Sequence, residues 1–355
     1  NHLGMDPTDG HTAVGNVVNP LIAAIDQDLA FAAAQPVARG VLDKIEQLSG
    51  GAFALRHPDG RLRLPVDLMN FTEQVVGVLA KGWFGLPDGV HMAAGGRLPA
   101  PAPAGQPRCP GHIIGPSRMI FGAHPHERVR AEGELHGPMV QKAVSDVLAA
   151  GPAPGPGAVT ALLREPLDKL KAAYGADLLE REVAGLLLGF APTVYGNFLT
   201  VMRNWIESER LWALQQDLAE RTQAGDTLLA AARAALLRPM LDTMQGEPVP
   251  PMVWRRPVVK GAPDPKALPV VLGLASAIES LDPAADQPRR DALLFGGDYF
   301  AKGSDRWGLH ACPGSKMGVG VMLAMAAALL DAGTLRATGS PVLLMLTSKA
   351  KPPPP

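Results

Sequence analysis

The amino-acid sequence predicts a mainly α-helical fold with a small β region, and three observations support this fold class. Apolar residues recur at three- and four-residue spacing through several long segments, which is the periodicity of helices with one buried face. After residue 250 the pattern changes to short β-like runs separated by Gly, Pro and Asp. Hydrophobic residues make up 47% of the 355-residue chain, which is ample for a large buried core.

The first half of the chain alternates helical periodicity with Pro- and Gly-rich segments. We expect helices over 16–48, 66–85 and 134–151, and an irregular loop over 86–118. Pro20 and Pro36 punctuate the first of these helices, and a glycine closes the second.

The longest periodic segment covers residues 177–222. It predicts a helix of about thirty residues followed by a break and a second helix. Pro192 lies near the middle of the first helix, where a proline removes a hydrogen bond and clashes with the carbonyl four residues back. We expect a kink there, which is either a plain bend in a core helix or part of a binding site.

The C-terminal third mixes short strands with one apolar helix. We expect β-like runs over 251–259, 267–276 and 340–346, no periodic structure over 282–311, and a helix over about 315–331. No repeat of 20 to 50 residues is visible.

Composition excludes several function classes. The net charge is −1 and aromatic residues make up 5%, so neither electrostatics nor stacking favours nucleic acid. No Walker loop, dinucleotide-binding glycine motif or nucleophile elbow is present. The longest apolar run, 317–330, has fourteen residues, whereas a membrane helix needs about 20, so no membrane span is expected. With two cysteines and no secretory signal, the expected location is the cytoplasm.

The two cysteines lie in different sequence contexts, although each begins a Cys-Pro-Gly sequence. Cys109 lies in a proline-rich stretch, whereas Cys312 precedes by three residues the helix expected at 315. A cysteine just before a helix meets free backbone N–H groups and the positive end of the helix dipole, which favour the thiolate that binds metals. Gly318 and Gly320 would let a flat group approach that helix. Cys312 is therefore either a metal ligand or a buried structural cysteine.

The sequence around Cys312 resembles the haem-binding loop of the cytochrome P450 family. Gly308, His310 and Gly314 stand four before, two before and two after the cysteine, as in Phe-x-x-Gly-x-Arg/His-x-Cys-x-Gly, although Asp305 replaces the Phe. Residues 253–300 and "DPTDGHTAVGNVV" are similar to that family's sheet with its following meander and to its third helix.

The resemblance implies a single haem-thiolate domain over 1–350 with a Pro-rich tail at 351–355. It would be a cytochrome P450 fold lacking its first helices and strands, because the sequence starts at what would be the third helix. It also implies haem b with Cys312 as iron ligand, while Cys109 is uninvolved. The implied cofactor-binding residues are Gly308, Gly314, His310, Arg255 or Arg256, and His11. His11 and His310 are alternatively ordinary surface residues.

Two departures from the family bear on activity. The family's Glu-x-x-Arg brace has Ala235 in place of its Glu if Arg238 is the arginine, and the Glu is missing as well if Arg233 is the arginine. We expect an unpaired arginine there. In the acid–alcohol pair of oxygen-activating members, Thr193 keeps the alcohol but Pro192 replaces the acid.

The resemblance therefore implies a haem-thiolate oxidoreductase with Thr193 and Pro192 at its catalytic centre. The Pro-Thr pair resembles the peroxide-using branch of the family, but Ala191 replaces the Arg that anchors a fatty-acid carboxylate there. We expect a small apolar substrate, with either peroxide or a ferredoxin or flavoprotein redox partner. We expect peroxide to support activity better than dioxygen does. The alternative is a haem-binding protein with reduced catalytic power, a sensor or a degenerate copy.

Overall fold

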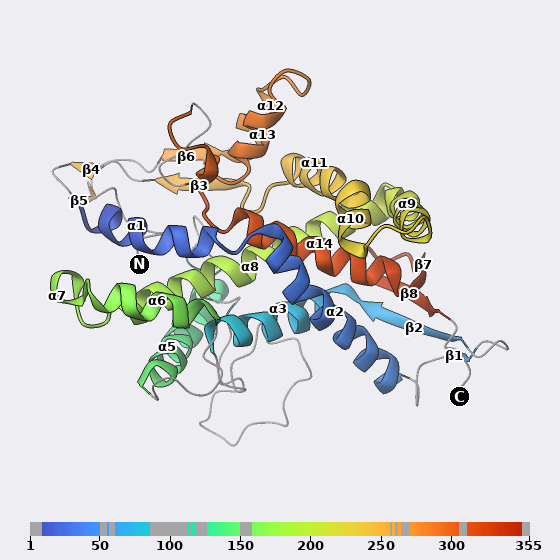
Figure 1. Cartoon of the computed structure of the whole chain (residues 1–355), viewed down its shortest axis with the longest axis horizontal. Helices are drawn as coiled ribbons and strands as arrows, with labels where there is room; N and C mark the ends of the chain where they lie inside the picture. The colour runs from blue at the N-terminus through green and yellow to red at the C-terminus, as the bar shows by residue number, and fades with distance from the viewer. Residues whose placement is uncertain are drawn as a thin grey trace. The chain divides into compact units, whose positions relative to one another are not determined.

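The computed structural model describes residues 9–49, 55–56, 61–85, 113, 116–117, 119, 126–149, 158–255, 258–259, 262–263, 270–304 and 311–349. It confirms a mainly helical chain with small antiparallel sheets (Figure 1). The chain divides into two compact units, each made of three separate stretches. Unit 1 comprises residues 1–25, 77–193 and 245–315, and unit 2 comprises residues 26–76, 194–244 and 316–355.

Unit 1 contains helices around the first half of the long helix α8 (Leu178–Glu207). Its other helices are α1 (Asp9–Ala23), the end of α3 (Leu68–Phe84), α5 (Glu127–Ala149), α6 (Ala158–Asp168), α7 (Lys171–Tyr174), α12 (Leu274–Glu279), α13 (Gln287–Leu293) and the short 3₁₀ turn Tyr299–Ala301. Its strands form two antiparallel pairs, β3 (Met252–Arg255) with β6 (Val270–Gly273) and β4 (Val258–Val259) with β5 (Ala262–Pro263). Helix α1 packs against α6.

Unit 2 is built around helix α14 (Ser315–Asp331), whose residues from Met317 to Leu330 are almost all buried. Its other helices are α2 (Gln27–Ser49), the start of α3, the second half of α8, α9 (Arg210–Gln223), α10 (Leu228–Ala232), the π-helical turn η2 (Arg233–Leu237) and α11 (Arg238–Gly246). A four-stranded antiparallel sheet has the order β1 (Leu55–Arg56), β2 (Leu62–Asp67), β8 (Leu343–Ser348), β7 (Gly333–Ala337).

Three leucines hold that sheet to the core of unit 2. Leu64 and Leu335 both pair with Leu346, and all three side chains are buried. Alternate residues of a strand point to opposite faces, so one aligned row of leucines is enough to define the buried face.

Several sequence predictions need new boundaries. The helix expected over 16–48 is two helices, and the break lies at residues 24–26 rather than at Pro20 or Pro36. Asp26 caps the beginning of the second helix, α2, because its carboxylate accepts hydrogen bonds from the N–H groups of Asp28 and Leu29, both at 2.9 Å. The helix expected to close at a glycine ends at Phe84, and Gly85 has a φ of 68°.

The prediction of a thirty-residue helix around Pro192 is confirmed, because α8 has 30 residues and remains helical through the proline. The break before α9 lies at Glu209, which has a φ of 59°. Helix α14 has the predicted bounds. Residues 282–311 are more regular than predicted, since α13 and a 3₁₀ turn form there. Strands β2 and β7 were not predicted.

Candidate functional site

The backbone of Cys312 is anchored at the N-terminal side of α14. The N–H of Cys312 donates to the carbonyl of Phe295 at 2.9 Å. Phe295 belongs to a tight turn after α13, in which the N–H of Gly297 donates to Ala292 at 2.8 Å and Gly296 and Gly297 have positive φ angles. The turn therefore fixes the position from which the cysteine side chain projects.

The Cys312 side chain is exposed, yet burial among protein atoms raises the pKa of its thiol. A hydrogen bond from the Gly314 N–H opposes this shift by a smaller amount. That the position before a helix favours the thiolate form of Cys312 stays a prediction.

Three glycines near Cys312 have different surroundings. A Cβ at Gly314 would lie 3.4 Å from a methyl of Ile22 in α1 and 4.0 Å from the Cys312 sulfur, so this glycine keeps the space beside the sulfur open. At Gly320 a Cβ would lie 2.8 Å from the Cβ of Ala30 and would overlap the Gln27 carbonyl. The suggestion that Gly320 accommodates a flat ligand is therefore wrong, because α2 occupies that face.

Gly318 marks where α8 runs beside α14. A Cβ there would lie 3.7 Å from a methyl of Val194. Val194 begins the second half of α8, and Gly318 lies in the first turn of α14. The second half of α8 and the first turns of α14 therefore meet inside unit 2.

The side chains around Pro192 leave one partly open strip on α8. Ala191 is fully buried, whereas Pro192 and Thr193 are half-buried. The Thr193 hydroxyl lies 2.5 Å from the Gly189 carbonyl oxygen and 3.1 Å from that of Phe190. Its proton is directed at the backbone, so toward a ligand the oxygen offers its lone pairs. Phe190 packs its ring on Trp83 at 5.1 Å between ring centroids, which makes the neighbouring surface apolar.

Half of the predicted cofactor-binding residues lie outside the described part of the chain. Gly308, His310 and Arg256 are not among the described residues, and neither are Cys109, Asp305 and the 351–355 tail. His11 lies in α1 and Arg255 in β3, but the structure describes only the backbone of each. Their roles stay predictions.

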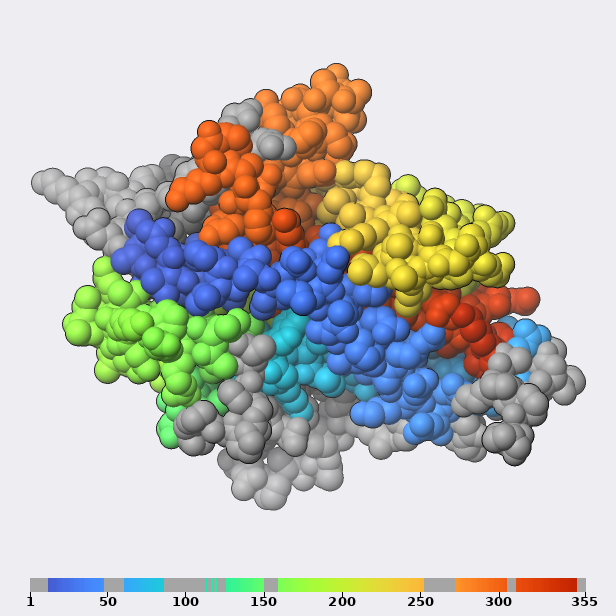
Figure 2. Space-filling view, viewed as in Figure 1, coloured from blue at the N-terminus to red at the C-terminus, as the bar shows by residue number. Residues whose placement is uncertain are grey.

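The arginines near the missing brace are both paired, contrary to our expectation of an unpaired charge. Arg238 donates to Asp242, one turn later in α11, at 2.7 Å, and both side chains are substantially exposed. Arg233 pairs with Asp28 where the helical segment 228–237 meets the start of α2, as Figure 2 shows in yellow and blue. Ala235 is buried. A buried alanine thus stands where the family has its glutamate, and both arginines form ion pairs with other residues.

A buried polar group in unit 1 braces the segment before the cysteine. Gln245 is 2% exposed, and its amide donates to Asp291 of α13 at 2.5 Å. The Gln245 oxygen accepts from Arg290 at 3.2 Å and from Gln287 at 3.4 Å. We call these four residues the Gln245 cluster. Because α13 leads into the turn that holds Cys312, the cluster supports the cysteine loop.

The sequence reasoning missed the Gln245 cluster and the Phe295 carbonyl. Gln245 and Asp291 are 46 residues apart in the chain, so no local pattern connects them. The sequence did carry one signal for the turn, the Gly296–Gly297 pair, which often marks backbone with positive φ.

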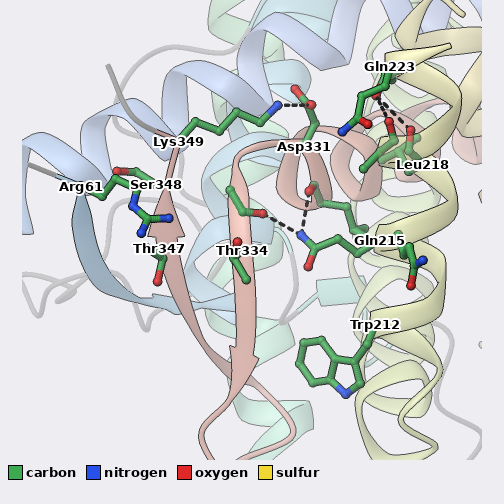
Figure 3. A pocket seen from close by; sticks show the side chains of 15 residues that line it. Arg61, Trp212, Gln215, Leu218, Gln223, Asp331, Thr334, Thr347, Ser348 and Lys349 are labelled. Carbon is green, nitrogen blue, oxygen red and sulfur yellow. Dashed lines mark hydrogen bonds and ion pairs between the residues drawn. The ribbon is translucent and has the colours of Figure 1, made fainter. Parts of the chain in front are cut away.

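A separate cavity of about 680 Å³ lies within unit 2 (Figure 3). It is lined by α9, the end of α14, the strands β7 and β8, Arg61 and Lys349, and none of the predicted site residues lines it. Gln215 fills one wall by donating to the carbonyls of Leu330 and Gly333, both at 2.8 Å. Asp331 pairs there with Lys349 at 2.5 Å. These polar groups of the cavity wall therefore already have partners within the protein.

Helix α8 is long and apolar enough to cross a membrane by length and composition. More than half of its apolar window, 56%, is buried inside the protein, as in the core helix of a water-soluble fold. Residues 12–23 and 27–47 pass the same test only as a pair, and they bend by 61°. Among the described residues, no three His, Cys, Asp or Glu side chains gather as a metal site.

Comparison with solved structures decides the fold. The crystal structure of CalO2 matches with a TM-score of 0.55 at 16% identity, over 98% of this chain and 80% of that one. The haem domain of cytochrome P450DA matches with a TM-score of 0.57 at 12% identity, over 98% of this chain and 78% of that one. The chain has a cytochrome P450 fold. The resemblance noted in the sequence is thus confirmed for the P450 fold, while no protein-family model and no curated protein matches the sequence.

Proposed function

We propose that the chain is a haem-thiolate oxidoreductase in which Cys312 ligates the iron of haem b. The observation that carries this proposal is the position of Cys312, which stands exposed on an anchored loop three residues before α14 in a P450 fold. When bound, the haem supplies an iron whose thiolate ligand promotes cleavage of an O–O bond.

The residues present fit such a group. Gly314 leaves space beside the sulfur, and its N–H points at the sulfur, which moderates the electron donation of a bound thiolate. Gly308 would complete the loop. His310, Arg255 or Arg256, and His11 are the proposed donors to the propionates, which need cations or N–H groups. Because burial favours the neutral thiol, binding of iron by Cys312 releases a proton.

Pro192 and Thr193 set the proton chemistry of the site. Thr193 accepts a hydrogen bond from a ligand while its own proton is held by the backbone. Pro192 has no titratable group and cannot deliver protons, a role that a positioned acid fills with a gain of about 10²–10⁴-fold. A peroxide brings its own protons and is already reduced, so it is the favoured oxidant.

The substrate class is inferred from the apolar surface beside Pro192. Residues 188–194 contain no charged side chain, and Ala191, fully buried, provides no anchor for a carboxylate. A small apolar organic molecule fits these surroundings best. We propose a cytoplasmic enzyme that uses either peroxide as the oxidant or dioxygen with a ferredoxin or flavoprotein as the electron donor.

The absorption spectrum of the reduced, CO-bound protein tests the cofactor assignment. The wild type and Cys109→Ser should both give the thiolate Soret band, and Cys312→Ser should lose it. A thiolate band that survives in Cys312→Ser would refute the assignment.

The oxidant preference is tested by turnover of an apolar substrate panel with hydrogen peroxide and with dioxygen plus an electron donor, at matched haem occupancy. The wild type should turn over faster with peroxide, and Pro192→Glu should shift the preference toward dioxygen if the new carboxylate faces the iron. Efficient coupling of electrons to product under dioxygen, with no gain from peroxide, would contradict the proposal.

The second candidate is a haem-binding protein of reduced catalytic power. The exposed Arg238, which pairs with Asp242, and the buried Ala235 favour it, because the glutamate of the family's brace is absent. Haem binding with no turnover in either regime would select this candidate.

A further inference from the structure

Pro192 creates a hydrogen-bonding problem inside α8. In a helix the N–H of each residue donates to the carbonyl four residues earlier, so the carbonyl of Leu188 would normally pair with residue 192. A proline has no N–H and leaves that carbonyl without its helical donor. In the interior of a fold, such a group needs another partner.

Ser117 supplies that partner from a distant part of the chain. Its hydroxyl donates to the Leu188 carbonyl at 2.5 Å, across 71 residues of sequence. The side chain is 1% exposed, so water does not compete freely for this bond. A buried serine thus replaces the amide that the proline lacks.

Contacts of the neighbouring residues fix the position of Ser117 within unit 1. Its N–H donates to the carbonyl of Ile113 at 3.3 Å, and Ile113 is 1% exposed. Two residues later, Met119 lies against Gly133 of α5 so closely that a Cβ on that glycine would be 2.6 Å from the Met119 Cβ. Ser117 is therefore fixed on both sides.

The carbonyl next to Leu188 belongs to Gly189, and the Thr193 hydroxyl donates to it. Two hydroxyl groups thus occupy two consecutive carbonyls at the proline. We propose that Ser117 is a positioning residue for Thr193. By occupying the Leu188 carbonyl, it keeps water out of the gap left by Pro192 and so maintains the backbone turn that orients the Thr193 hydroxyl. The functional meaning rests on the proposed role of Thr193, but the contact itself is tested without haem.

A double-mutant cycle on the haem-free chain tests the proposal. Ser117→Ala should lower the folding equilibrium constant about 5- to 150-fold, because a buried carbonyl loses its donor. In the Pro192→Ala background the new amide can serve that carbonyl, so Ser117→Ala should change the constant by no more than about threefold. The quantity measured is the urea unfolding midpoint and slope of all four proteins.

Thr160 provides a matched control in the same unit. Its hydroxyl donates to the Phe84 carbonyl at 3.0 Å, and its side chain is 2% exposed, but no proline is involved. Thr160→Val should therefore cost the same with Pro192 as with Ala at that position.

Amide hydrogen exchange separates positioning from general stability. Ser117→Ala should accelerate exchange selectively at Ala191, Thr193 and Val194 relative to residues 179–187 of the same helix, and adding Pro192→Ala should reverse this. Uniform acceleration along α8, or an equal cost of Ser117→Ala in both backgrounds, would overturn the proposal.

If Ser117→Ala does not fold, recovery of folding in the double variant supports the proposal. A double variant that fails to fold, while Pro192→Ala folds, overturns it. If the double-mutant cycle is non-additive but the protein shows no haem-thiolate absorption spectrum, the role of Ser117 is upheld and only the proposed function is rejected.

Discussion

Replacing Gly320 by alanine should destabilise the protein, whereas the same change at Gly318, two residues earlier in α14, should stabilise it. In a helix interior, Gly→Ala by itself contributes about 1 kcal/mol of stability. At Gly318 the new Cβ would make an ordinary contact, 3.7 Å from Val194, so this gain remains.

At Gly320 the added methyl meets atoms that cannot rotate away. It would lie 2.8 Å from the Cβ of Ala30 and overlap the Gln27 carbonyl oxygen, so α2 and α14 would have to separate. Overpacking of a core costs about 1–3 kcal/mol or somewhat more. With a cost of about 3 kcal/mol, the net loss is about 2 kcal/mol, and the two variants should differ by about 3 kcal/mol.

Urea unfolding of the haem-free wild type and the two single variants, followed by far-ultraviolet circular dichroism, measures this difference. Equal slopes would show that the variants change stability rather than the extent of unfolding. A Gly320→Ala variant as stable as Gly318→Ala would refute the close approach of α2 to α14.

Two further perturbations test unit 1. Gln245→Leu should cost about 1.5–3 kcal/mol, because a carboxylate loses a buried donor, and should speed alkylation of Cys312 in the haem-free chain. Gln216→Leu replaces an exposed glutamine and serves as the control, so it should change neither the stability nor the alkylation rate of Cys312. An unchanged alkylation rate in Gln245→Leu would show that the Gln245 cluster does not support the cysteine loop. Burial lowers the pKa of His136, so the unfolded chain takes up its proton at a higher pH than the folded chain does. Stability from this residue is therefore complete above about pH 6.5 and falls as the pH drops below it. His136→Gln should flatten the decline in urea midpoint between about pH 7.5 and 5.5, and an unaltered decline would exclude this source.

The long helices were predictable because their periodicity is local. Helix α14 was predicted at its observed bounds and α8 at its observed length, since each carries many apolar residues at regular spacing. Strand β2 was missed because Pro65 interrupts its alternation. The sequence nevertheless held a marker for its end, since Asp67 caps α3 by accepting from the N–H groups of Met69 and Asn70.

The candidate site was predictable in part. The place of Cys312 before a helix was visible in the sequence, but the direction of its pKa shift was not, because desolvation depends on atoms from many segments. Pro192 in α8 indicated that the Leu188 carbonyl lacks its helical donor, but no local pattern in the sequence identified Ser117 as the replacement donor. The Gln245 cluster likewise depends on tertiary contacts alone.

During synthesis on the ribosome, α14 emerges after the helices that pack around it. The first two stretches of unit 2 end at residues 76 and 244, and the helix that fills their common core begins only at residue 315. Until then, the apolar faces of α2, α3 and the second half of α8 have no core helix to cover them. Exposed apolar surface in an incomplete chain promotes aggregation. The order of elements therefore leaves the nascent chain prone to aggregation until the whole of α14 has left the ribosome.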